Sequence, residues 1–210
     1  MSRYQASTAR RLEQLMNERL ERILHRMPEG AAKATLAELR RGVGRAPGEL
    51  PGLWGILLEG LPEELQGAGS EPSEEENALY AALTLFAVHQ QGWDLKGSPM
   101  HRSGSSFGAA VAALAALAPA GDENARERVE RRFTRAATST ELKELSYHLR
   151  GLVQMLGANG IPVDWAQTAS QLYRWQFPGQ TASVRLRWGE DFYRASARGT
   201  DNDQRKDETQ

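Results

Sequence analysis

The strongest chemical pattern in this 210-residue sequence is a row of arginines between residues 128 and 135. On a helix of about 3.6 residues per turn, positions i, i+3, i+4 and i+7 lie on one face. Glu123, Glu127 and Glu130 fall off that face. A guanidinium row matches the charge of a nucleic-acid backbone, whose contacts are independent of sequence and sensitive to salt. The row consists of Arg128, Arg131, Arg132 and Arg135.

Two interpretations of this row remain open. It binds phosphates, or it is a solvated helix face on which Glu127 pairs with Arg131 at i, i+4. The net charge of −1 hides a segregation, since residues 61–80 hold six acids and no base and residues 199–210 hold four acids and two bases. The rest of the chain has 24 basic and 17 acidic residues. The body of the protein is therefore basic, which favours an anionic partner.

Two further basic groups are weaker candidates for nucleic-acid binding. One ends a predicted helix and continues into its loop, where the cations could instead pair with the negative end of the helix dipole. The other lies in a long glycine-rich loop. The first group is Arg40, Arg41 and Arg45, and the second is Lys96 and Arg102.

Patterns typical of enzymes are missing from the sequence. His25, His89, His101 and His148 show no spacing that puts two imidazoles on one helical face, and the chain has no cysteine. The glycine-rich segments lack the Lys-Ser/Thr of a phosphate loop, and the serines after Gly104 lack the context of a nucleophile elbow. We expect structural, hydrogen-bonded roles for His89 and His148. We predict no enzyme activity, no metal site and no cofactor.

Apolar residues spaced three and four apart predict an all-α fold, a helical bundle of about eight to nine helices in two packed lobes with no sheet. The capping-box spacing of Ser73 and Glu76 predicts a buried helix that starts at residue 74. Thr138 and Glu141 have the same spacing and predict the start of a leucine-rich helix. Asp164 is expected to cap a helix, as is the aspartate at position 122.

The expected organisation is an N-terminal helical lobe over residues 1–118, a C-terminal helical lobe over 119–198 and a polar tail over 199–210. The tail has no apolar residue, so we expect it to be disordered. A last helix is expected over 181–197. The loop 92–104 has the composition of a mobile functional segment. No apolar run reaches the roughly 20 residues that cross a bilayer and the N-terminus lacks a signal core, so we expect a cytoplasmic protein without membrane contact.

Aromatic residues concentrate near the C-terminal end of the sequence. They could stack on bases, but their helical spacing beside leucines favours packing in a core or an interface. The set comprises Trp165, Tyr173, Trp175, Phe177, Trp188, Phe192 and Tyr193.

Six segments in a fixed order resemble the CasB family, the small subunit of type I-E CRISPR surveillance complexes (Cascade). The resemblance spans about residues 8–196 and depends on the order of the segments, since none is a catalytic signature. One departure is Ala109-Ala110, where the family pattern leads us to expect an arginine. The segments are LAELRRGVGRAPGELPGLW (36–54), ALTLFAVHQQG (82–92), GSSFGAAVAAL (104–114), VERRFTRAATSTELKELSYHLRGLVQML (129–156), IPVDWAQTASQLYRW (161–175) and VRLRWGEDFYR (184–194).

The resemblance implies a non-enzymatic, all-helical subunit that binds DNA and RNA-containing complexes. Two copies would lie beside the backbone and large subunits, and their basic surfaces would hold the target and displaced DNA strands of the R-loop during antiviral interference. The implied partners are single-stranded regions of target DNA, the crRNA ribonucleoprotein, the other Cascade subunits and a second copy of the chain. The basic positions that match the family are Arg40 and Arg41, Arg131, Arg132 and Arg135, and more loosely Lys96 and Arg102.

Two alternatives from other classes stay open. A helical interaction adaptor would use its basic patch to dock an acidic protein partner and would show no DNA affinity. A small hydrolase in the loop 92–104 would need a pocket and a shifted titratable group, and the sequence identifies neither.

Overall fold

A computed structural model describes residues 3–68, 71–119 and 123–207, with only the backbone described at 123 and 199–207. The described part folds into nine α-helices joined by short 3₁₀ and π turns, and it contains no strand. The predicted all-helical fold is confirmed. The helices are α1 (Arg3–Glu21), α2 (Glu29–Arg41), α3 (Trp54–Leu58), α4 (Glu74–His89), α5 (Phe107–Ala116), α6 (Glu123–Ala137), α7 (Leu142–Ala158), α8 (Trp165–Trp175) and α9 (Pro178–Asp207).

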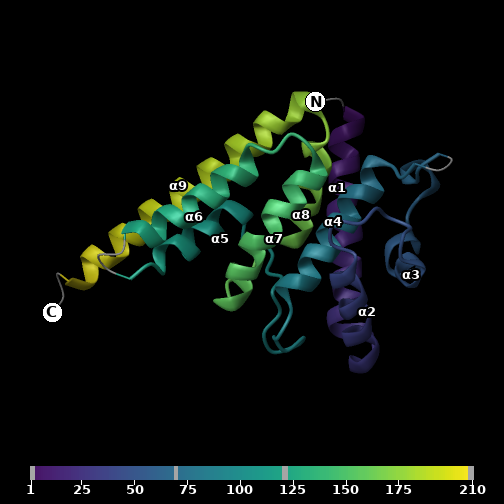
Figure 1. Cartoon of the computed structure of the whole chain (residues 1–210), viewed down its shortest axis with the longest axis horizontal. Coiled ribbons are helices and arrows are strands. Elements are labelled where there is room, and N and C mark those ends of the chain that lie inside the picture. The colour runs from purple at the N-terminus through teal and green to yellow at the C-terminus, as the bar shows by residue number, and fades with distance from the viewer. Residues whose placement is uncertain (1–2, 69–70, 120–122, 208–210) are drawn as a thin grey trace.

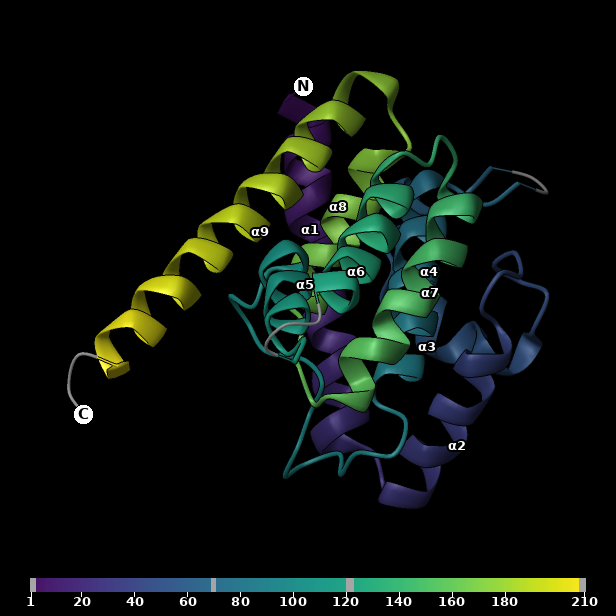
Figure 2. The same ribbon diagram turned by 60° about the vertical axis from the view of Figure 1, so that its left-hand side comes forward.

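Helix α4 lies in the middle of the bundle, where α2, α7 and α8 pack around it (Figure 1). Every residue from Ala78 to His89 is buried, because the sequence of this helix is apolar on all sides. Helix α1 packs along α8, while α5 packs against α6 and α9. Figure 2 shows α9 along the edge of the molecule, with its C-terminal end extending past the other helices.

The buried apolar side chains form one contiguous core that includes helices from both sides of residue 118. The division into two lobes at this residue stays a prediction. Helices α5 and α9 approach closely because Gly108 has no side chain, since a Cβ there would lie 2.2 Å from the backbone oxygen of Trp188. None of the helices in the described residues combines the length and apolar character that a membrane crossing needs.

Two of the predicted helix starts are confirmed by their capping bonds. The Glu76 amide donates to Ser73 Oγ at 3.0 Å, and the Ser73 amide donates to a Glu76 carboxylate oxygen at 2.9 Å. Asp164 accepts the Gln167 amide at 2.9 Å and so caps α8. Together these bonds satisfy amides that a helix leaves unpaired at its N-terminus. The expected cap at position 122 lies outside the described residues.

The capping box predicted at Thr138 and Glu141 is wrong. Thr138 donates its hydroxyl to the Arg135 carbonyl at 2.9 Å and so closes α6 instead of opening the next helix. Helix α7 begins only at Leu142, and its N-cap residue Glu141 makes no side-chain capping bond. The Thr140 amide donates to the Glu144 carboxylate at 3.0 Å, so the acid that completes this turn lies three residues later than predicted.

The last helix is longer than predicted in both directions. It starts at Pro178, which suits the first helical position because proline has no amide to satisfy there. It continues to Asp207 and so includes most of the polar segment that was expected to be disordered. Extending a helix that is already packed fixes one residue per hydrogen bond and avoids the cost of nucleation, so the segment needs no apolar residues of its own.

The glycine-rich loop 92–104 is held by hydrogen bonds to two neighbouring helices, and its mobility stays a prediction. Gln90 accepts the Met100 amide at 2.8 Å and donates to the Trp93 carbonyl at 3.3 Å. The Gly104 amide donates to the Asp164 carboxylate at 2.8 Å. The loop backbone is therefore bound to Gln90 at the end of α4 and to Asp164 at the start of α8.

Candidate nucleic-acid interface

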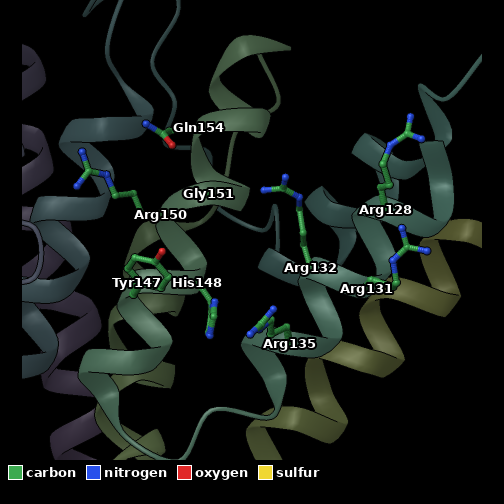
Figure 3. A pocket seen from close by; sticks show the side chains of 9 residues that line it. All are labelled: Arg128, Arg131, Arg132, Arg135, Tyr147, His148, Arg150, Gly151 and Gln154. Atoms are coloured by element: carbon green, nitrogen blue, oxygen red, sulfur yellow. The ribbon is translucent and has the colours of Figure 1, made fainter. Parts of the chain in front are cut away.

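The arginine row on α6 faces α7 across an open groove of about 730 Å³ (Figure 3). The opposite face of α6 fixes its orientation, since Val129, Phe133 and Ala136 are buried there. The Phe133 ring stacks on Trp188 and on Phe192, with centroids 6.2 and 5.5 Å apart. The groove is lined by Arg128, Arg131, Arg132 and Arg135 from α6 and by Tyr147, His148, Arg150, Gly151 and Gln154 from α7.

None of the residues on the α7 side of the groove was predicted from the sequence to bind nucleic acid. Leucines at 145, 149, 152 and 156 are buried on one face of α7. Tyr147, Arg150 and Gln154 lie at i, i+3 and i+7 on another face and are exposed. This polar stripe beside the leucine stripe is a signal that could have identified them, because it falls on the helix that follows the arginine row.

Arg132 lies across the floor of the groove. A Cβ added to Gly151 would be 3.6 Å from Nη1 of Arg132, an ordinary contact distance, so this guanidinium lies beside the Gly151 position of α7. Figure 3 shows Arg132 extending toward Gly151 and Arg135 extending toward His148. The cations of α6 therefore reach over to α7.

The groove is strongly cationic. Two carboxylates lie beside it: Glu127, 3.2 Å from Nη1 of Arg131, and Glu144, 3.9 Å from Nε2 of His148. The ion pair that was the simpler interpretation of the row thus exists, but it neutralises only one of the arginines. Within the described part of the chain, Arg132, Arg135 and Arg150 have no carboxylate in salt-bridge range. Such a cluster of like charges is stabilised by an anion.

The other predicted basic residues do not line this groove. Arg45 lies 3.7 Å from the Glu49 carboxylate, in a separate cavity beside Tyr80. Arg40 is half-buried and lines a third cavity, with Trp93. The structure brings together four of the nine candidates and disperses the rest. The last three of the predicted basic residues are exposed and line none of these cavities: Arg41, Lys96 and Arg102.

His89 has the structural role predicted for it. It is completely buried, its Nδ1 accepts the Trp165 indole N–H at 3.0 Å, and its Nε2 lies 3.0 Å from the Ile161 carbonyl. Burial lowers the pKa of His89 to about 4. His148 differs, because it is only half-buried and its ring forms part of the groove.

The packing role predicted for the C-terminal aromatic residues is confirmed for Trp165, Tyr173, Trp175, Trp188 and Phe192, which are buried. Tyr193 is 72% exposed on α9, so it lies outside the core, and an interface role for it stays a prediction. Phe177 is half-buried. In the residues that the structure describes, no group of three or more histidine, aspartate and glutamate side chains comes together as a metal ion would require.

The comparisons with known proteins agree on one family. Residues 35–193 match the family of the CRISPR-associated protein Cse2. CasB from Thermobifida fusca is 30% identical, with a TM-score of 0.66 over 88% of this chain and 97% of that chain. CasB from M. ruber is 25% identical, with a TM-score of 0.64 over 90% and 96%. A chain titled CRISPR RNA-guided surveillance complex shares the fold at 21% identity, with a TM-score of 0.67 over 92% and 98%. No curated protein matches.

Proposed function

The chain belongs to the Cse2 (CasB) family, and from this premise we propose that it is a non-catalytic subunit of a CRISPR surveillance complex in which the α6–α7 groove holds a single DNA strand. The observation that carries this proposal is the groove itself, with five guanidinium groups on its two walls. The partners would be the other Cascade subunits, a second copy of the chain and the strands of the R-loop.

The proposed mechanism is electrostatic. When guide pairing separates the two target strands, the arginines bind phosphates of an unpaired strand and so disfavour its reannealing. Arg132, Arg135 and Arg150 contribute most, because no carboxylate of the described residues competes with phosphate for them. Guanidinium groups that bind phosphates read charge, so sequence would be read by the guide RNA.

Fluorescence anisotropy of labelled single-stranded DNA over a salt series tests the proposal. We expect binding that is independent of sequence and weakens with salt. For each phosphate neutralised on a single strand, log K should fall by about 0.7 when the salt concentration rises tenfold. The double variant Arg132→Glu and Arg135→Glu should lose about a hundredfold in affinity or more at moderate salt.

The matched control is Arg3→Glu with Arg10→Glu, two exposed arginines of α1 that lie outside the groove, which changes the net charge equally. It should lose less than about threefold. Equal losses in both double variants would show that net charge, and not the groove, sets the affinity. No binding of wild type at low salt would overturn the proposal and favour the adaptor, whose arginines dock an acidic protein.

A further inference from the structure

Tyr147 lies on the α7 rim of the basic groove with 75% of its surface exposed. Its ring meets the ring of the neighbouring His148 edge-on, with centroids 5.3 Å apart at 71°. Despite this contact, most of the tyrosine side chain remains accessible to a ligand. An aromatic ring so exposed gains little from folding, and its surface is available to a ligand of the groove.

The other exposed tyrosines have different surroundings. Tyr193 is 72% exposed on α9, and its ring contacts Phe192 edge-on at 5.3 Å. Tyr4 is 58% exposed and borders a cavity lined with the acids Glu64, Glu71 and Glu74. Of the three exposed tyrosines in the described residues, only Tyr147 borders the arginine groove.

Tyr147 is a neighbour on α7 of the position that faces Arg132. Gly151 follows Tyr147 at i+4, so the two residues share a helix face at a separation of about 6 Å. The Arg132 guanidinium lies 3.6 Å from the Cβ position of Gly151. A phosphate bound at Arg132 would therefore bring an adjacent base within reach of the Tyr147 ring.

Charge alone would not select an unpaired strand. Duplex DNA carries twice as many phosphates per unit length as one of its strands, so a purely cationic groove would favour the duplex. An aromatic face discriminates in the other direction, because the bases of a duplex are stacked and paired inside it, while those of a single strand are free to stack on a side chain.

We propose that Tyr147 forms a nucleobase subsite, in which one unpaired base stacks on its ring while the adjoining phosphates bind the α6 arginines. The inference rests on the proposed function of the groove and assigns to it a preference for unpaired strands. The subsite takes any base, because every base has a face to stack.

The test compares an intact oligothymidine with a strand of equal length and phosphate count that carries abasic residues throughout its central portion. The full-length wild-type protein should bind the intact strand about tenfold more tightly than the abasic one. In Tyr147→Ala this difference should disappear, while the dependence on salt keeps its slope. Tyr147→Phe should restore the difference, since it keeps the ring.

Tyr193→Ala is the matched control, because it removes an equally exposed tyrosine outside the groove and should leave both affinities unchanged. Thermal unfolding of each variant checks that the fold is intact. If wild type binds the two strands equally but with a steep dependence on salt, the subsite is refuted and the proposed function stands. If neither strand binds at low salt, both are refuted. Loss of the difference in Tyr147→Phe as well would also overturn stacking.

Discussion

The two faces of α6 contrast sharply although they belong to one 15-residue helix. One face carries exposed arginines that meet α7 across a groove. The other carries Phe133, whose ring stacks on Trp188 and Phe192 in the core. The contrast teaches that stability and binding are separable here: the aromatic face holds the helix in place, and the arginine face then becomes available to a ligand. Each substitution below should affect one of the two and spare the other.

The largest effect is expected from Trp188→Ala. The Trp188 indole is completely buried, contacts the rings of Phe107 and Trp175 at 5.0 and 5.2 Å, and donates to Gln171 at 2.7 Å. Its loss leaves a cavity and an unpaired amide oxygen, so the free energy of unfolding should fall by about 4 kcal/mol. Urea unfolding followed by circular dichroism measures the change.

On the arginine face, Arg132→Ala should change the free energy of unfolding by less than about 0.5 kcal/mol. A comparable loss of stability in both variants would mean that the two faces are not separable. Trp188→Ala should still bind DNA at temperatures where it is folded.

The stability of the core should also depend on pH. The pKa of buried His89 is lowered to about 4, below the ordinary value of 6.5. Between these two values the unfolded chain binds a proton that the folded protein excludes, so stability falls as pH falls through this window. The loss should approach about 3 kcal/mol near pH 4. Burial also lowers the pKa of His101, which adds in the same direction.

Urea unfolding at pH 7 and at pH 4.5 measures this response, and His89→Gln is the variant that tests its origin. The glutamine amide can still accept the Trp165 indole N–H but does not titrate. The variant should therefore lose much less stability on acidification than wild type. An identical acid response in both proteins would assign it to other groups.

Helical periodicity predicted the buried faces and the arginine row because both depend only on spacing along one helix. It could not predict the groove, since the partner face of Tyr147, Arg150 and Gln154 belongs to another helix and meets α6 only through tertiary packing. For the same reason the sequence could not show that Arg40 and Arg102, the weaker basic candidates, lie apart from the groove. The capping error at Thr138 has a local cause, because one hydroxyl can close the preceding helix or open the next.

On the groove side, Gly151→Glu should weaken binding without weakening the fold. A Cβ at Gly151 meets nothing closer than Arg132 Nη1 at 3.6 Å, so a side chain fits, and replacing a mid-helix glycine stabilises by about 0.5–1 kcal/mol. The added carboxylate would pair with Arg132 and repel phosphate. We expect about a tenfold loss of affinity for single-stranded DNA, measured by anisotropy.

Two controls separate the charge from the helix effect. Gly151→Ala should gain stability and keep its affinity. Gly189→Glu places the same acid in an open position on α9, where no atom lies within 4 Å of a new Cβ, and should bind nearly as wild type. If Gly189→Glu loses as much affinity as Gly151→Glu, the effect reflects net charge rather than a blocked groove.

The smallest expected effect is that of Glu127→Gln, which frees Arg131 from the carboxylate 3.2 Å away. An exposed i, i+4 pair contributes about 0.3–0.5 kcal/mol, so the loss of stability should be of that size. Affinity for single-stranded DNA should rise about twofold, because the competing anion is gone.

Glu130→Gln is the matched control, since it breaks the similar pair with Arg126 at 2.9 Å, and neither residue of that pair lines the groove. A gain confined to Glu127→Gln would locate the phosphate contact at Arg131, whereas equal gains would show that the groove responds only to overall charge.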